Sequence, residues 1–185
     1  IAVITNLAPN HLDVHKDMDE YVGAKKNIYR YQNSDDKLIV NLDNAITAPL
    51  LGNGEIRYFS RQTKPENGTY LENGMIFRVK NGVSEEVMPM DTILLPGIHN
   101  VENYMTAIAV TDGLVSDETI RHVAATFGGV EHRIELVRIK DGVRFYNDSI
   151  ASSPSRTIAG LRSFPEQVIL IAGGYDKHIP FEPMV

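Results

Sequence analysis

The side chains best suited to chemistry flank a short hairpin pattern between residues 131 and 154. Apolar residues alternate along residues 134–139 and 143–146, and an Asp-Gly pair between these runs favours a tight turn. Arg133 precedes the pattern and Asp148 follows it. A guanidinium donates paired hydrogen bonds to phosphate oxygens, whereas a carboxylate accepts from ribose hydroxyls or binds a cation. Taken alone, the segment favours a surface Arg beside an ordinary Asn-Asp-Ser turn, with a nucleotide site as the alternative.

Two asparagines form a second candidate group. Asn100 and Asn103 follow residues 95–97, where Pro and Gly end an apolar run. Asn100 suits the N-cap of a helix whose apolar side includes residues 101–109. Residues three apart share the first helical turn, so both amides can reach one ligand. Helix capping alone also explains Asn100, and His99 is expected to be a structural neighbour.

A histidine and a lysine near the N-terminus form the third group. His11 lies in a polar loop after the β-branched run at residues 1–6, which is typical of a buried strand. In open α/β sheets, ligands collect at the carboxyl ends of strands, where this loop would lie. Lys25 falls on a predicted helix, at the edge of the face that carries Tyr21 and Ile28. By themselves, a loop His and a helix Lys are ordinary residues.

The elements that position these groups alternate between strands and helices, which is typical of an α/β protein. We expect strands at residues 1–6, 37–41 and 168–172, and a meander of short strands with Asn-Gly turns between residues 56 and 87. The strand at 168–172 follows a helix that begins at Ser153 and Pro154, and it precedes a Gly-Gly loop. This order predicts a doubly wound, Rossmann-like unit of which only the beginning is present.

A further helix is expected to pack into the core. Ser116 suits its N-cap. The residues predicted to face inward are Ile120, Val123, Ala124 and Phe127.

The composition is that of a soluble, folded protein. Of its 185 residues, 43% are hydrophobic and 23% are charged, and the formal net charge is -6. This charge argues against a surface for nucleic acid or anionic membrane, and the lack of cysteine excludes disulfides and Cys-type zinc sites. No signal peptide or apolar run of about 18 residues is visible, so we expect a cytoplasmic protein. The first residue is Ile and both ends cut into apolar patterns, so we expect a piece of a larger protein.

Several short strings occur in a characteristic order along the chain. They are N-x-x-x-x-H-L-D, A-K-x-x-I-Y, L-P-G-x-H-N-x-x-N, H-R-x-E before the hairpin, Y-N-D-S-x-A after it, and G-G-x-x-K. In this order they resemble the Mur ligases, the ATP-dependent amino acid ligases of peptidoglycan synthesis. The resemblance runs from Asn6 to Phe181. Each string is only moderately specific, so their order carries the resemblance.

The resemblance implies a metal-binding role for two residues. His11 would bind a second magnesium ion, and Lys25 would react with carbon dioxide to form a carbamate. Carbamylation requires a neutral amine, and it converts a cation into a carboxylate-like ligand. Both residues would therefore serve catalysis through the metal.

The resemblance also implies contacts with nucleotide and substrate. The nucleotide contacts would be Asn100 and Asn103 at the adenine of ATP, Arg133 at the phosphates, and Asp148. Arg133 would also stabilise charge on the transferring phosphoryl group. Ser152 and Lys177 would bind the incoming amino acid. Ile150 departs from the family pattern, because many relatives carry a Lys at that position.

Two partial domains follow from the resemblance. Residues 1–145 would be the later half of a central ATP-binding domain, and residues 146–185 the start of a Rossmann-like C-terminal domain that binds the amino acid. The sequence contains no G-x-x-x-x-G-K-[ST] phosphate loop. The family carries that loop upstream, together with a metal-binding Glu and a uridine-nucleotide domain. We therefore expect this chain to be inactive by itself.

The implied activity is amide-bond ligation driven by ATP with Mg²⁺. D-glutamate would be added to UDP-N-acetylmuramoyl-L-alanine by way of an acyl phosphate, and the enzyme is expected to be a monomer. The nearest alternatives are a folylpolyglutamate synthase or a Mur ligase that adds another amino acid. A non-catalytic nucleotide-binding module is an alternative from another class, although such a module has no need of both His11 and Lys25.

Overall fold

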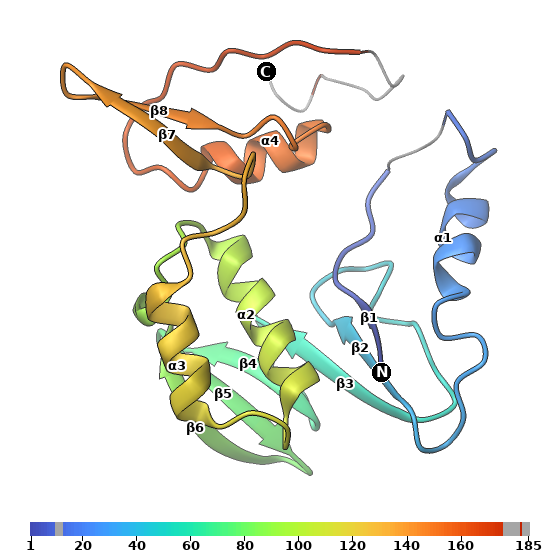
Figure 1. Cartoon of the computed structure of the whole chain (residues 1–185). Helices are drawn as coiled ribbons and strands as arrows, with labels where there is room; N and C mark the ends of the chain where they lie inside the picture. The colour runs from blue at the N-terminus through green and yellow to red at the C-terminus, as the bar shows by residue number, and fades with distance from the viewer. Residues whose placement is uncertain (10–12, 176–181, 183–185) are drawn as a thin grey trace.

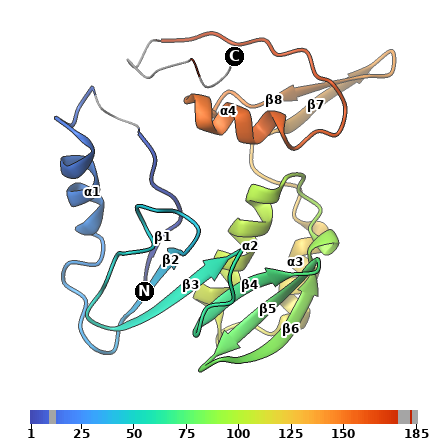
Figure 2. The same cartoon turned by 180° about the vertical axis from the view of Figure 1, so that it is seen from behind.

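The computed structural model describes residues 1–9, 13–175 and 182. Its larger part is a six-stranded sheet with helices on both faces, and a hairpin beside a helix forms a smaller part (Figure 1, Figure 2). The strands of the larger part are β1 Ala2–Ile4, β2 Lys37–Asn41, β3 Glu55–Ser60, β4 Gly68–Glu72, β5 Met75–Lys80 and β6 Val83–Pro89. Its helices are α1 Met18–Lys26, the 3-10 helix η1 Met90–Thr92, α2 Ile98–Thr111 and α3 Asp117–Thr126. The smaller part contains β7 Glu135–Lys140, β8 Val143–Asn147 and α4 Pro154–Leu161.

The sheet joins a parallel half to an antiparallel half. Its strand order follows the chain from β1 to β6, with parallel pairs as far as β4 and antiparallel pairs beyond it. The Asn73-Gly74 turn has φ angles of 50° and 78°, and the Asn81-Gly82 turn has φ angles of 50° and 77°. Two positive φ angles match the twist of paired strands, which explains the choice of Asn-Gly. The expected strand at 37–41 and the Asn-Gly meander are thus confirmed.

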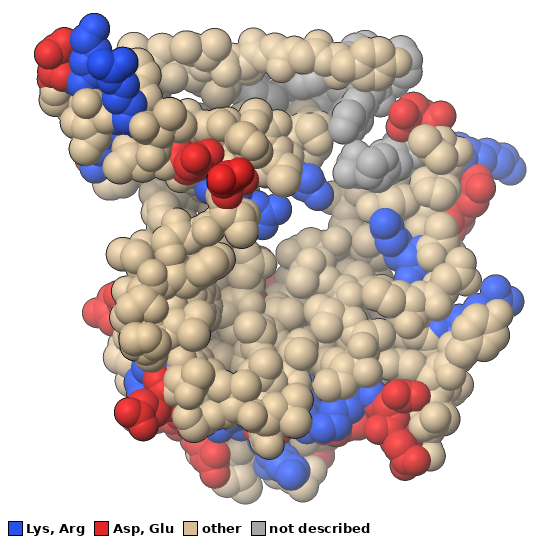
Figure 3. Space-filling model, viewed as in Figure 1, with Lys and Arg blue, Asp and Glu red and all other residues tan. Residues whose placement is uncertain are grey.

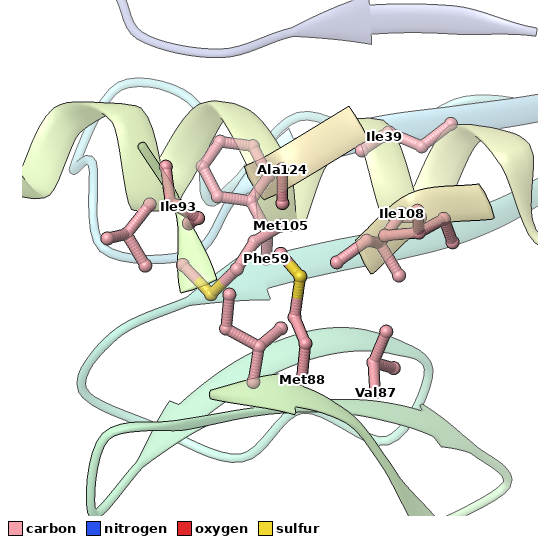
Figure 4. Packing of buried hydrophobic residues seen from close by; sticks show 12 residues of the cluster. Ile39, Phe59, Val87, Met88, Ile93, Met105, Ile108 and Ala124 are labelled. Atoms are coloured by element: carbon pink, nitrogen blue, oxygen red, sulfur yellow. The ribbon is translucent and has the colours of Figure 1, made fainter. Parts of the chain in front are cut away.

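Alternate side chains of β2 enter two different cores. Leu38 and Val40 pack with Tyr21 of α1, whereas Ile39 packs on the other face with Met105 of α2 (Figure 4). None of the three β2 side chains is more than 1% exposed, because both faces of this parallel strand are covered. Helices α1 and α2 consequently lie on opposite faces of the sheet.

Helix α3 begins as the sequence predicts, but only half of its expected inward face is buried. The hydroxyl oxygen of Ser116 accepts a backbone N–H of the first turn at 3.2 Å. Ile120 and Ala124 are buried, whereas Val123 and Phe127 are 44% and 43% exposed. The prediction for these two residues was wrong, because Ile120 and Ala124 enter the core cluster whereas Val123 and Phe127 line a cavity. None of the described helices is long and apolar enough to cross a lipid bilayer.

The smaller part confirms the hairpin and corrects one strand. The Asp141-Gly142 turn has φ angles of 50° and 80°, and α4 begins directly after Ser153. The strand predicted at 168–172 does not form, and Ile169 and Ile171 are each 95% exposed. An apolar strand of this type requires neighbours and cover on both faces. Among the described residues, β7 and β8 pair only with each other, so the segment has no sheet to join.

Candidate nucleotide-binding site

A cavity of about 340 Å³ lies between α2, α3 and the segment that leads from α3 to β7. Three of the predicted site residues, Asn100, Asn103 and Arg133, line it together. The remaining walls are Leu95, Pro96, Tyr104, Ala107, Val123, Phe127, Gly129, Val130 and Ile134. Figure 3 shows a hollow between the larger and smaller parts, with Lys and Arg atoms at its border. A mainly apolar cavity with a few convergent polar groups is the usual form of a small-molecule site.

The two asparagines are linked to each other in the first turn of α2. The amide nitrogen of Asn100 donates to the carbonyl oxygen of Pro96 at 2.7 Å, and its amide oxygen accepts from Asn103 Nδ2 at 3.2 Å. Asn100 is buried, so its amide serves mainly to fix the side chain of Asn103. The amide oxygen of Asn103 makes no hydrogen bond with any described residue, so it can accept one from a ligand.

Helix α2 begins earlier than the sequence predicts, and Gly97 is the reason. Gly97 precedes the first helical residue with φ 94°, so Asn100 is not the N-cap. A Cβ at Gly97 would collide with the Ser163 hydroxyl and would lie 2.7 Å from the ring of His99. Glycine alone combines this φ angle with this close approach. The contact brings the end of α4 against the start of α2.

Arg133 leaves its guanidinium available for an anion. The residue is exposed and lies in the segment between α3 and β7. Its side chain makes no hydrogen bond or ion pair with any residue that the structure describes. It does act on His99, whose pKa lies below its ordinary value mainly because burial disfavours the charged ring. The positive charge of Arg133 lowers that pKa further, against the opposite influence of nearby carboxylates.

The lowered pKa of His99 predicts a pH dependence of stability. Unfolded His99 binds a proton near pH 6.5, whereas the folded residue does so only at lower pH. Between these values the unfolded chain binds more protons, so the stabilisation present above about pH 6.5 is lost as the pH falls. Urea unfolding across this range should therefore show a weaker pH dependence for His99→Gln than for the wild type. The exposed His122→Gln variant is the control, and equal slopes for wild type and His99→Gln would contradict the prediction.

Asp148 lies beside the cavity without lining it. Its Oδ1 accepts a hydrogen bond at 3.2 Å from the backbone N–H of Ile134, the residue that follows Arg133. A Cβ at Gly160 of α4 would lie 2.8 Å from Oδ2, so α4 closely approaches the same carboxylate. Direct contact of Asp148 with a nucleotide stays a prediction, and the contact observed is with the neighbour of Arg133.

Two further predicted site residues, Lys25 and Ser152, do not line the cavity. Lys25 is exposed on α1, on the other face of the sheet, with its Nζ 5.2 Å from the centre of the Tyr21 ring. Ser152 is exposed just before α4. His11 and Lys177 lie outside the described residues. Within the described ranges, no three His, Asp or Glu side chains gather in a way that would hold a metal ion.

The sequence did not reveal the apolar walls of the cavity. Val123 and Phe127 were predicted to enter the core, Tyr104 was predicted only to lie on the apolar side of its helix, and Val130 carried no prediction. The available signal was the spacing of Val123 and Phe127 by one helical turn. Such spacing marks an apolar side, but it does not distinguish a core contact from a cavity wall.

Comparisons with known proteins give the chain a family. The Mur ligase middle domain matches residues 1–111. Over its whole length the chain is 55% identical to the UDP-N-acetylmuramoylalanine-D-glutamate ligase of Acetivibrio thermocellus and 54% identical to that of Clostridium beijerinckii. It spans 40% of the length of each of these relatives.

Solved structures share the α/β fold. MurF from Acinetobacter baumannii has a TM-score of 0.68 at 22% identity, over 90% of this chain and 38% of that one. MurC from Thermotoga maritima has a TM-score of 0.61 at 21% identity, over 87% and 37%. These likenesses confirm the predicted fold class. With the middle-domain match over residues 1–111, they lead to one conclusion: the chain belongs to the Mur ligase family.

Proposed function

We propose that this chain is part of an ATP-dependent ligase that adds D-glutamate to UDP-N-acetylmuramoyl-L-alanine in peptidoglycan synthesis. The observation that carries the proposal is the cavity in which Asn100, Asn103 and Arg133 come together. Its amides and guanidinium suit the base and phosphates of a nucleotide. The identity of 55% to a relative named for D-glutamate ligation supports the choice of reaction.

ATP is the ligand that we assign to the cavity. The free amide oxygen of Asn103 would accept from the adenine amino group, while the apolar walls would contact the faces of the base. Arg133 would donate to the phosphates as a planar fork. A MurF from Thermotoga maritima, with a TM-score of 0.58, was solved in complex with ADP, which supports a nucleotide in this fold.

The reaction would proceed in two steps. The substrate carboxylate attacks the γ-phosphoryl group of ATP, which gives an acyl phosphate and ADP. The neutral amine of D-glutamate then attacks the acyl carbon, phosphate leaves with the bonding electron pair, and the nitrogen releases one proton to phosphate or solvent to give the amide. Charge develops on the transferring phosphoryl group in the first step, where Arg133 would stabilise it. Positioning of the reactants would supply most of the remaining catalysis, and no protein nucleophile is required.

Lys25 and His11 are the residues that we propose as magnesium ligands. Magnesium would neutralise phosphate charge when bound. Lys25 would take this role as a carbamate. It is accessible to dissolved carbon dioxide and its Nζ forms no ion pair with a described carboxylate, although the contact of Nζ with the Tyr21 ring favours the ammonium form. An ion pair would favour the ammonium form, which does not react with carbon dioxide. The carbamate oxygens would then be suitable ligands for a hard cation.

Replacement of Lys25 should impair metal binding without impairing folding. In the intact ligase that contains this chain, we expect Lys25→Ala to reduce turnover about a hundredfold, as loss of a metal-orienting group does. Added short carboxylates should restore part of the activity. With ¹³C-labelled bicarbonate, a carbamate signal should appear in the wild type and disappear in the variant. The adjacent Lys26→Ala is the control, and a wild type without the carbamate signal would remove Lys25 from the proposal.

We propose two partial domains, residues 1–145 for the nucleotide and residues 146–185 for the amino acid. The separate sheet formed by β7 and β8 supports a division in this region, and the boundary at residue 145 falls within β8. Ser152 and Lys177 are the proposed contacts of D-glutamate. We also propose that the protein acts as a monomer in the cytoplasm, where ATP is supplied.

Phosphate release by the intact ligase is the experiment that tests the function. The assay contains ATP, Mg²⁺ and UDP-N-acetylmuramoyl-L-alanine, and it compares D-glutamate with L-lysine, diaminopimelate and L-glutamate. Turnover with D-glutamate alone is the expected result. Turnover with a different amino acid would assign the protein to another ligase of the family. No turnover with any of them would overturn the proposal in favour of a folate substrate or a non-catalytic nucleotide-binding module.

A further inference from the structure

Polar groups of the sheet bind one side of α2, the helix that carries the two asparagines of the cavity. Their partners on α2 follow one another at intervals of three or four residues, so they lie on the same face of the helix. These partners are Glu102, Met105, Ala109 and Asp112. The contact at Glu102 lies between Asn100 and Asn103 in the chain, so it can affect them most directly.

The partner of Glu102 is Arg61, in the turn after β3. Nε of Arg61 donates to Oε1 of Glu102 at 2.6 Å. The side chains of Arg61 and Glu102 are 33% and 15% exposed, so salt screens their attraction only in part. A hydrogen bond between charged groups is also stronger than one between neutral groups. The pair therefore ties the start of α2 to the carboxyl end of β3.

The turn that carries Arg61 is itself held by the loop after β2. Oδ2 of Asp43 accepts the backbone N–H of Arg61 at 2.6 Å, and Oδ1 accepts the hydroxyl of Ser60 at 2.5 Å. The Ser60 oxygen accepts the backbone N–H groups of Gln62 and Thr63 at 3.0 and 2.8 Å. Arg61 thus projects from a turn whose backbone is already ordered, which reduces the entropy lost when it pairs with α2.

Apolar packing alone does not fix the rotation of this part of α2. Val101 and Met105 belong to the core cluster beneath the helix, but apolar contacts have no preferred direction. Asn103 lies about 100° around the helix from Glu102. A small rotation about the helix axis would therefore move the amide oxygen of Asn103 relative to the cavity.

We infer that Arg61 and Glu102 are positioning residues, whose ion pair sets the rotation of α2 that directs Asn103 towards the nucleotide. Neither of the two is among the described residues that line the cavity, so they act through Asn103. Without the pair, the start of α2 adopts the binding-competent rotation for a smaller fraction of the time, and the apparent affinity falls by that fraction. The inference rests on the proposed function, because ATP is the ligand assigned to the cavity.

Substitution of each partner in the intact ligase separates positioning from charge. In both Arg61→Ala and Glu102→Ala, KM for ATP should rise about fivefold, the largest change in an equilibrium constant expected for a partly exposed ion pair. The kcat should stay close to that of the wild type, because the pair contributes only to binding. A direct effect of charge on ATP would instead raise KM when Arg61 is removed and lower it when Glu102 is removed. Such opposite shifts would overturn the inference.

A double variant tests whether the pair acts through Asn103. In the Asn103→Ala background, Glu102→Ala should raise KM for ATP no further, because the side chain that the pair positions is already absent. Residues that act through one another show such non-additive effects, whereas independent sites add. A further fivefold rise in this background would contradict the positioning role.

Asp112→Ala is the matched control at the other end of α2. Its carboxylate also pairs with arginines of the sheet, at 2.9 Å from Arg57 Nη1 and 3.0 Å from Arg78 Nε, but it lies about 15 Å along the helix from Glu102. This variant should be less stable to urea and should keep the KM of the wild type. A rise in KM equal to that of Glu102→Ala would mean that KM follows stability alone, which would also overturn the inference.

Hydrogen exchange gives a readout that does not need ATP. The backbone amides of residues 102–104 should exchange faster in Arg61→Ala than in the wild type, because the start of α2 opens more readily without its tie to β3. Arg61→Ala leaves the sequence of α2 unchanged, so helix propensity does not contribute. Unchanged exchange would overturn the inference whatever the nucleotide. A wild-type ligase that fails to bind ATP while Arg61→Ala still accelerates exchange would instead overturn the proposed function alone.

Discussion

Replacement of Arg133 by alanine should lower ATP-dependent turnover of the intact ligase by about a thousandfold or more, as loss of an arginine at a transferring phosphoryl group does. Arg133 lines the cavity with Asn100 and Asn103, and no described side chain neutralises its charge. Without the guanidinium, no paired N–H donors stabilise the negative charge that develops on the phosphoryl group. The loss should appear mainly in kcat, because this interaction strengthens in the transition state.

Arg133→Lys and Arg138→Ala are the comparison variants for this experiment. Arg133→Lys keeps the charge but not the paired donors, so it should recover only part of the rate. Arg138→Ala changes an exposed arginine on β7 and should leave turnover unchanged. Unfolding midpoints of the three variants would separate catalytic loss from misfolding. A well-folded Arg133→Ala with less than a tenfold loss would remove this residue from the chemistry.

Arg57 should have the largest effect on stability. Its side chain is 8% exposed and ties β3 to the end of α2, with Nη1 2.9 Å from Asp112 Oδ2 and 3.1 Å from the carbonyl oxygen of Ala109. Its Nε also donates to Glu55 at 2.8 Å. Removing the guanidinium breaks its hydrogen bonds to two carboxylates and one carbonyl, but Asp112 keeps Arg78 Nε at 3.0 Å and both carboxylates are partly exposed. We therefore expect Arg57→Ala to lower the free energy of unfolding by ~2–3 kcal/mol, as the loss of hydrogen bonds to charged groups does.

Urea unfolding of three variants would test this expectation. Arg57→Met fills much of the space without the charge, so it shows how much of the loss comes from packing. Arg121→Ala is the control, because it removes a single hydrogen bond to the carbonyl oxygen of Val87 at 2.6 Å from an exposed residue. Its expected cost is about 1 kcal/mol. A similarly small loss for Arg57→Ala would show that the network contributes little to stability.

Features that depend on neighbouring residues followed from the sequence. The apolar run at residues 37–41 became a buried parallel strand, and the Asn-Gly and Asp-Gly pairs became turns with two positive φ angles. Ser116 and Ser153 mark the starts of α3 and α4. In each case the relevant physics acts within a few residues, so the sequence alone contains the information.

Features that depend on distant parts of the chain did not follow. The start of α2 is determined by the approach of Ser163 to Gly97, and Val123 is half exposed because it lines the cavity. The hydrogen bond from the backbone N–H of Ile134 to Asp148 was not predicted, and contact of Asp148 with a nucleotide stays a prediction. The resemblance to the Mur ligases predicted that Asn103 and Arg133 bind the same nucleotide. Hydrophobic periodicity alone does not indicate that these two residues lie close together.

Strand pairing changes from parallel to antiparallel at β4. The two halves of the sheet on either side of this change should form at different rates. Strands β4 to β6 are joined by two-residue turns, and such hairpins form in about 1–10 μs. The pair β1–β2 must wait for the ends of a long intervening segment to meet, because Ala2 pairs with Leu38. The antiparallel half can therefore form before β3 and β2 join it. Among the described strands, β1 needs the longest chain closure to meet its partner.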